Sequence, residues 1–204
     1  MSHSFSTSTQ APLVLQRVES LGFAVFKDNN HDINLIAARN LNGRPNKFDD
    51  FLHVIFKEDH LFHHYEFVCT TDPGLYHLHS PSRVAGTAIV KHDQQIRSGF
   101  TFGQHKGQYD CLVPTKPIPV WRDHNKDNNL DHQGNYTSSA IQIHRASAWR
   151  RSSLVNKWSA GCIVIADPES FSVFMNLMRL QVKAGLGDMF SLTVIGWPAL
   201  ELSS

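Results

Sequence analysis

Short apolar runs separated by turns are the feature that most limits what this chain can fold into. The runs are rich in β-branched and aromatic residues and are bounded by Gly, Pro, Asn and Asp. Strands are expected at 23–26, 33–39, 51–57, 65–70, 109–113, 120–121, 140–143, 162–165 and 190–197. Helical spacing occurs only over 13–21 and about 168–183. Because strands outnumber helices and do not alternate with them, the sequence predicts a mainly β (α+β) protein, a β-sandwich or partly open barrel with flanking helices.

The length and net charge of the chain limit its domain organisation and the kinds of partner it can bind. At 204 residues the chain can bury a substantial core in a single domain. We expect a polar, disordered tail over residues 1–10 and one domain over residues 11–204. A net charge of +1 gives no electrostatic case for nucleic acid, and no apolar run is long enough to span a membrane. The three cysteines, an odd number, favour free thiols over a disulfide framework.

The stretch from Ile141 to Ile165 carries the residues best suited to chemistry. It reads as a strand ending at His144, a basic loop with Trp and Ser, a turn at Ser159-Ala160-Gly161, and a second strand opened by Cys162. If the two strands are neighbours, the imidazole and the thiol meet at one end of a sheet, where the base can activate the nucleophile. Gly161 permits a tight bend that aims the amides of Gly161 and Cys162 at an oxyanion. The alternative is a cysteine that serves as a small core residue.

This stretch resembles the signature of the L,D-transpeptidase catalytic domain family. In that signature a histidine precedes a loop, and the loop ends in Ser/Thr-x-Gly-Cys and an apolar residue. His144 and the run Ser159-Ala160-Gly161-Cys162-Ile163 fill the pattern, in an order that papain-like peptidases reverse. Ala160, Val164 and Arg145 differ from the residues that the family commonly has at these positions, as in a divergent member.

The resemblance implies the L,D-transpeptidase type of barrel and a cysteine peptidyl-transferase or hydrolase. Its substrates would be peptidoglycan stem peptides, with Cys162 forming a thioester and His144 acting as base and later as acid. An amine would complete transpeptidation and water would complete carboxypeptidase or endopeptidase action, and the sequence leaves both open. The departures from the signature keep open a non-catalytic cell-wall-binding or structural module with the same fold.

Several residues near the motif are candidates for substrate binding. His105 lies in a glycine-flanked polar loop, Gly103–Tyr109, that leads into a strand at Tyr109. Loops of this kind often approach substrate, although a solvated histidine is the alternative. The loop from Arg145 to Trp158 is expected to be a lid. Arg145 and Trp158 are further candidates for substrate binding, and Trp149 and Trp158 would wall the cleft. The loop's charged residues Arg150, Arg151 and Lys157 would attract carboxylates, with a plain solvated loop as the alternative.

The turn Thr70-Thr71-Asp72-Pro73-Gly74 is interpreted as a loop that leaves a strand. The alternative is that Thr71 and Asp72 line the substrate cleft.

The 13 histidines make metal binding a necessary consideration. His77 and His79 would share one strand face, and His60, His63 and His64 are close in sequence. The sequence has no HExxH motif and no paired Cys ligands, so a zinc-dependent peptidase is the less favoured alternative.

A calcium site is the remaining cofactor candidate. Asp123, Asn125 and Asp127 alternate like the opening of a calcium loop. The glycine and the closing glutamate of an EF-hand are both missing, so a polar turn is the alternative and no other cofactor is expected.

The polar N-terminus lacks the basic and apolar regions of a signal peptide. We therefore expect a bacterial or phage protein that is made in the cytoplasm and acts in the periplasm or cell wall after non-classical export, as a phage lysis protein or a secreted effector. A protein partner for export or immunity stays open.

Overall fold

The computed structural model of the chain describes residues 3–197. Met1 and Ser2 of the expected tail, and residues 198–204 at the end of the expected domain, lie outside the described residues. The described chain is mainly β, as predicted, with one large mixed sheet, one small sheet and three helices.

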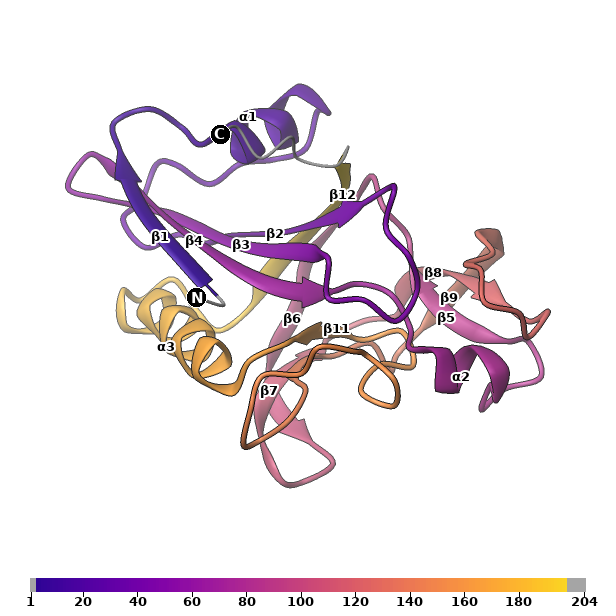
Figure 1. The fold of residues 1–204 in the computed structure, drawn as a ribbon. Helices are drawn as coiled ribbons and strands as arrows, with labels where there is room; N and C mark the ends of the chain where they lie inside the picture. The colour runs from indigo at the N-terminus through magenta and orange to yellow at the C-terminus, as the bar shows by residue number, and fades with distance from the viewer. Residues whose placement is uncertain (1–2, 198–204) are drawn as a thin grey trace, which may run out of the picture.

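The large sheet has nine strands and curls into a partly closed ring (Figure 1). Its strands are β1 (His3–Ser8), β2 (Asn34–Asn40), β3 (Asp50–Glu58), β4 (Leu61–Thr70), β6 (Gln94–His105), β7 (Tyr109–Pro114), β10 (Ile143–Arg145), β11 (Ile163–Ile165) and β12 (Phe190–Trp197). They follow the order β1-β4-β11-β10-β7-β6-β12-β2-β3, and β3 also pairs with β4, which closes the ring. The pairs β10–β11 and β12–β2 are parallel.

The small sheet lies beside the large one and has the order β5-β8-β9. Its strands are β5 (Thr87–Val90), β8 (Ile118–Asp123) and β9 (Gln133–Ser138). The short helix α2 (Leu75–His79) lies next to this sheet, at the opposite end of the molecule from helix α3 (Pro168–Lys183) (Figure 1). Helix α3 begins where its sequence predicts, because the Asp167 carboxylate accepts a hydrogen bond from the Ser170 N–H at 2.9 Å and Pro168 occupies the first turn.

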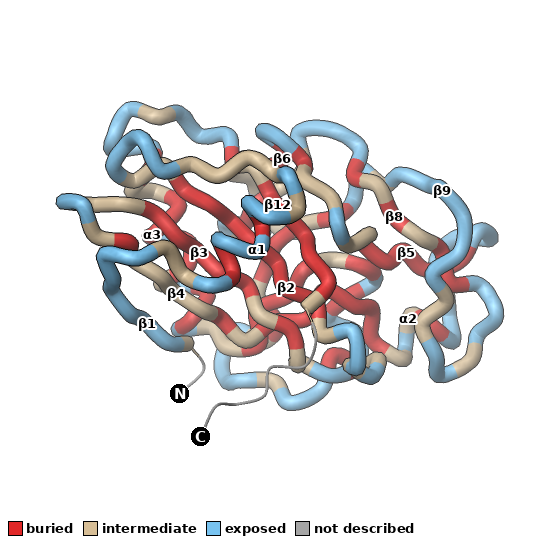
Figure 2. Tube along the Cα trace, turned by 90° about the horizontal axis from the view of Figure 1, so that it is seen from above, coloured by how far each residue is buried: buried red, intermediate tan, exposed pale blue. Residues whose placement is uncertain are grey.

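Two apolar cores lie on opposite faces of the strands β2, β3 and β12. Helix α1 (Leu13–Ser20) covers one face, where its Val14, Leu15 and Val18 pack with Ile36 and Ile195. The larger core is on the other face, toward α3, where alternate residues of the same strands turn inward. Figure 2 shows this buried interior as a continuous band through the central strands. The framework around the site described below is therefore rigid and well packed.

The N-terminal segment forms a strand, whereas a disordered tail was expected. Strand β1 pairs along β4, with Phe5 opposite Tyr65, and the two rings lie 4.4 Å apart between centroids. A sheet edge offers main-chain partners to any sequence, so the polar composition of this segment did not prevent pairing.

The expected strand at residues 23–26 is irregular instead. The main chain of Phe26 is bound by the side chain of Asn34, which accepts from the Phe26 N–H at 2.7 Å and donates to the Phe26 carbonyl at 2.7 Å. These main-chain groups therefore need no partner strand.

Two further differences concern histidines. His77 and His79 lie on helix α2, so they do not share a strand face. His105 ends the long strand β6, which polar residues had concealed, and only residues 106–108 turn between β6 and β7.

Candidate active site

The neighbouring strands β10 and β11 bring His144 and Cys162 to one cavity. The strands pair in parallel with Ile143 opposite Ile163, and the Ile163 N–H donates to the Gln142 carbonyl at 3.0 Å. Because side chains alternate along a strand, this register puts His144 and Cys162 on the same side of the sheet. Both line a cavity of about 1060 Å³. The condition set by the sequence analysis, that these two strands are neighbours, is met.

The turn before Cys162 is fixed by its own serine and glycine. The buried Ser159 hydroxyl donates to the Cys162 carbonyl at 2.8 Å and accepts from the Gly161 N–H at 3.1 Å. Gly161 has φ +118, and a Cβ there would lie 2.5 Å from the Ala88 carbonyl oxygen. Only glycine fits this close approach to strand β5. Because the Gly161 N–H already donates to Ser159 inside the turn, it does not serve as the oxyanion donor expected from the sequence. Of the two amides expected to bind the oxyanion, the Cys162 N–H is the remaining candidate.

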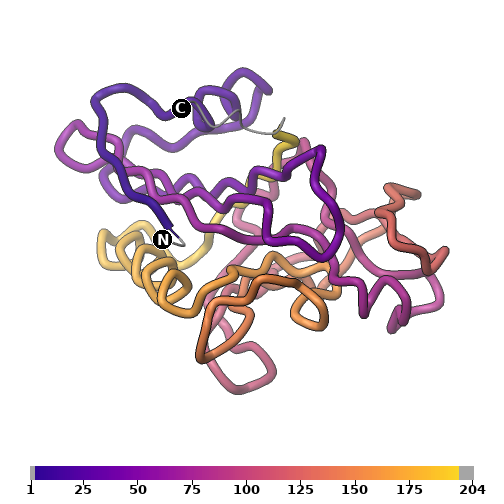
Figure 3. Tube along the Cα trace, in the orientation of Figure 1, coloured from indigo at the N-terminus to yellow at the C-terminus, as the bar shows by residue number. Residues whose placement is uncertain are grey.

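The loop before this turn is anchored to two other parts of the chain. The Gly74 N–H donates to the Ser159 carbonyl at 3.0 Å, and a Cβ on Gly74 would lie 2.0 Å from the Asn156 carbonyl oxygen. Asn46, between β2 and β3, accepts from the Val155 N–H at 3.1 Å and donates from its amide to Asn156 at 3.1 Å. Figure 3 shows this part of the chain lying against the β2–β3 loop. These contacts hold residues 155–159 in place beside the cavity, and the loop from Arg145 to Trp158, which was expected to be a lid, is called the wall segment below.

Thr71 and Asp72 hold the base of the same turn region together. Both are buried, and the Thr71 hydroxyl lies between Arg39 Nε, at 2.8 Å, and the Asp50 carboxylate, at 2.7 Å. Arg39 Nε is also 3.3 Å from Asp72 Oδ1. Thr71 and Asp72 are absent from the lining of the Cys162 cavity, in agreement with their interpretation as a loop leaving a strand.

The hydrogen bonds of His144 define its protonation. Its Nδ1 lies 2.8 Å from the Arg145 carbonyl, which can only accept, so Nδ1 carries the proton and Nε2 carries the lone pair. Burial lowers the pKa of His144 to about 4. The hydrogen bond to the Arg145 carbonyl raises this pKa, and electrostatic interactions with His105, Lys106 and Arg145 lower it. The ring is therefore neutral at pH 7 and able to accept a proton.

Cys162 is a neutral thiol in this state. Burial raises its pKa to about 11, although the Gln142 N–H, 3.4 Å from Sγ, and the positive charge of Lys106 oppose the shift. The thiol donates to the Ala140 carbonyl at 3.5 Å. The pair therefore rests as thiol and imidazole, and the proton would have to move as the sulfur attacks.

Three of the four residues expected to bind substrate form a stack next to His144. The His105 ring lies 4.2 Å from the His144 ring and 5.3 Å from the Tyr109 ring, and the Arg145 guanidinium lies 3.9 Å from the Tyr109 ring centroid. The Tyr109 hydroxyl donates to the Arg145 carbonyl at 3.3 Å, beside the bond from His144. The structure thus brings His105, Tyr109 and Arg145 together with the candidate base.

The wall segment contributes some of its expected residues to the cavity. Trp149, Lys157 and Trp158 line it, whereas the exposed Arg150 and Arg151 do not. Lys106 and Gln142 also line it and were missed by sequence reasoning. Gln142 holds His105 Nδ1 at 2.6 Å, and its place two residues before His144 on one strand face is the signal that would have found it.

The three candidate calcium ligands lie at the end of β8 and in the acidic loop that follows it. Asp123 is buried at the end of the strand and accepts from the Asp131 N–H at 2.9 Å, whereas Asn125 and Asp127 are on the loop. The Asn125 amide donates to Asp131 at 2.7 Å and to Asp127 at 3.2 Å. The Asp127 N–H donates to the Asn125 side-chain oxygen at 3.2 Å and the Asn129 N–H donates to the Asp127 carboxylate at 2.7 Å, which are the bonds of polar Asx-type turns.

Comparison with protein-family models found no match, and comparisons with curated proteins and with solved structures found none either. Of the helices in residues 3–197, none has the length and apolar character needed to cross a membrane. Arguments about function therefore rest on the geometry of the Cys162 cavity and on the sequence motif that forms it.

Proposed function

We propose that the chain is a cysteine peptidyl-transferase or hydrolase of the L,D-transpeptidase type that acts on peptidoglycan stem peptides. The observation that carries the proposal is the convergence of Cys162 and His144, from adjacent parallel strands, on one large cavity. The Ser159–Cys162 turn, which carries the sequence motif, fixes the thiol at that cavity.

Each group has a definite task in this mechanism. His144 Nε2 takes the thiol proton while Cys162 Sγ attacks the carbonyl of an L-residue that precedes a D-residue. The C–N bond then breaks, the leaving amine takes the proton from His144, and a thioester remains on Cys162. An amine from another stem or a water molecule resolves the thioester, which releases the thiol again. The Cys162 amide supports the oxyanion, and one such donor contributes roughly 3 kcal/mol to the transition state.

The charge and shape of the cavity suit a stem peptide. Lys106, Arg145 and Lys157 are cationic groups that can attract an anionic ligand into the cavity, while Trp149 and Trp158 supply flat apolar walls. These residues surround the thiol and imidazole on the wall segment and on the β6–β7 turn.

A non-catalytic module that binds cell-wall peptides is the second candidate. The raised pKa of Cys162 and the lowered pKa of His144 favour it, because both shifts disfavour the thiolate–imidazolium pair. In that case the same cavity would bind stem peptides without cleaving them.

Mass spectrometry of muropeptides tests the proposal. Purified tetrapeptide muropeptides are incubated with the wild type and with Cys162→Ala. New cross-links or exchanged terminal D-residues with the wild type alone would establish transpeptidation, and shortened stems would establish hydrolysis. Unchanged muropeptides with folded wild-type protein would favour the binding module if the cavity binds them, and would refute both candidates if it does not.

A further inference from the structure

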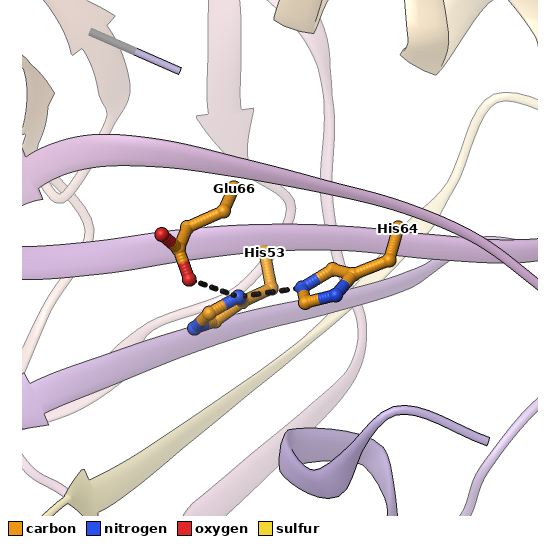
Figure 4. A group of neighbouring side chains, drawn as sticks. All are labelled: His53, His64 and Glu66. Atoms are coloured by element: carbon orange, nitrogen blue, oxygen red, sulfur yellow. Dashed lines mark hydrogen bonds and ion pairs between the residues drawn. The ribbon is translucent and has the colours of Figure 1, made fainter. Parts of the chain in front are cut away.

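A second group of reactive side chains lies on the β3–β4 hairpin, away from the Cys162 cavity. It consists of His53 on β3 with His64 and Glu66 on β4 (Figure 4). His53 is directly opposite Glu66 in the strand register, and His64 lies two residues from Glu66, so all three side chains share one sheet face. Sequence reasoning grouped His64 with His60 and His63 instead, because it could not know the register.

The donor atoms of these three residues converge on one point. His53 Nδ1 is 2.9 Å from His64 Nε2 and 3.6 Å from Glu66 Oε2. One ligand atom from each residue lies within 4.8 Å of the others. In a tetrahedral zinc site with bonds of about 2.0–2.1 Å, neighbouring ligand atoms are roughly 3.3 Å apart, which lies between the two measured spacings.

The group is buried on one side and open on the other. His53 is 5% exposed at its side chain and Glu66 is 28% exposed. All three residues line a cavity of about 390 Å³ that β1, the start of α1 and Trp197 enclose. Within residues 3–197, the recorded polar partner of the Glu66 carboxylate is the His53 ring. A half-buried carboxylate beside two imidazoles, with space in front of them, leaves a further coordination position for water or a small ligand.

We propose that His53, His64 and Glu66 bind a divalent transition-metal ion, with zinc as the best fit. Two imidazole nitrogens and one carboxylate form a donor set that zinc and its neighbours prefer, whereas calcium and magnesium prefer oxygen ligands. Three protein ligands with an open position are the arrangement of reactive zinc sites, while closed structural sites have four. Among the described residues, the cavity shares no lining residue with the Cys162 cavity, so this site is separate from that of the proposed peptidyl transfer.

Metal titration of the full chain tests this proposal. The protein is stripped with a chelator and titrated with Zn²⁺ by calorimetry, and with Co²⁺, whose visible absorption reports tetrahedral coordination. We expect one equivalent to bind to the wild type. His64→Ala and Glu66→Gln should each weaken Zn²⁺ binding at least about a hundredfold, because loss of even an outer-sphere partner costs 10–100-fold.

His63→Ala is the matched control, since His63 is next to His64 on β4 and points to the opposite sheet face. It should bind Zn²⁺ as the wild type does. Thermal unfolding in chelator checks that all three variants are folded. Equal Zn²⁺ affinity in the wild type and His64→Ala, or an equal loss in His63→Ala, would overturn the proposal. Wild-type protein that gives no saturable one-to-one binding would overturn it as well and would leave the two histidines as a hydrogen-bonded pair.

Discussion

Replacing Gly161 by alanine is the most direct perturbation of the turn that positions Cys162. Alanine at φ +118 is strained by about 1–3 kcal/mol. Its Cβ would also lie 2.5 Å from the Ala88 carbonyl oxygen and 2.9 Å from the Ala88 Cβ, contacts that force β5 or the turn to move. Overpacking of this kind costs about 1–3 kcal/mol more. We therefore expect Gly161→Ala to lower the free energy of unfolding by about 2–6 kcal/mol in all.

Gly22→Ala separates backbone strain from the clash. Gly22 also has a positive φ, +79, but a Cβ there would have no atom of residues 3–197 within 4 Å. That variant should lose only about 1–2 kcal/mol, the cost of a left-handed conformation. Urea unfolding followed by tryptophan fluorescence measures both variants against the wild type. Equal losses in the two variants would refute the close packing of the Cys162 turn on β5.

Four further outcomes follow from the same structure. Ser159→Ala should cost about 1–3 kcal/mol in urea unfolding, because it leaves the buried Gly161 N–H without its acceptor, whereas the exposed Ser153→Ala should be neutral. The folded-state pKa of His144, about 4, lies below its unfolded value of 6.5, so this residue's contribution to stability is present above pH 6.5 and is lost as pH falls toward 4. His144→Gln should remove about 3 kcal/mol of that acid-induced loss, and parallel pH curves for the variant and the wild type would contradict this. At pH 7.5 the raised pKa of Cys162 should make its alkylation by iodoacetamide roughly thirtyfold slower in the folded protein than in the unfolded chain. Peptide mapping measures both rates, and faster modification in the folded protein would contradict a neutral thiol. Arg39→Ala should cost about 3–5 kcal/mol in urea unfolding because it leaves the buried Asp72 without its cation, and a loss below 1 kcal/mol would show that this carboxyl is neutral without Arg39.

The predictable part of the fold is the part in which local pattern and tertiary environment agree. Helix α3 follows from its N-cap and apolar spacing, and α1 follows from its spacing alone. The strands β2, β3, β4 and β12 are apolar runs that lie in the interior, and they were expected close to their observed positions.

The errors occurred where a partner elsewhere in the chain decides the structure. Strand β1 is polar and is held by β4, and the strand expected at 23–26 is replaced by bonds from one asparagine side chain. The polar residues of β6 break the alternation that marks a half-buried strand, so this long strand was not expected.

The candidate site was predictable to the same extent. His144 and Cys162 belong to a local motif, which placed them at neighbouring strands, although the structure begins β11 at Ile163, one residue after Cys162. The role of Gly74 as a close neighbour of the Cys162 loop, and the convergence of His53 with Glu66, depend on contacts that no single segment encodes.

Detection of a covalent intermediate on Cys162 would test the central claim most directly. The wild type, Cys162→Ala and His144→Ala are mixed briefly with tetrapeptide muropeptides, quenched in acid and examined by intact-protein mass spectrometry and peptide mapping. The mechanism predicts that the wild type gains the mass of an acyl group, that the group maps to Cys162, and that hydroxylamine removes it. Cys162→Ala should gain nothing, and His144→Ala should acylate far more slowly. Turnover of muropeptides by Cys162→Ala, or an acyl group on another residue, would contradict the account.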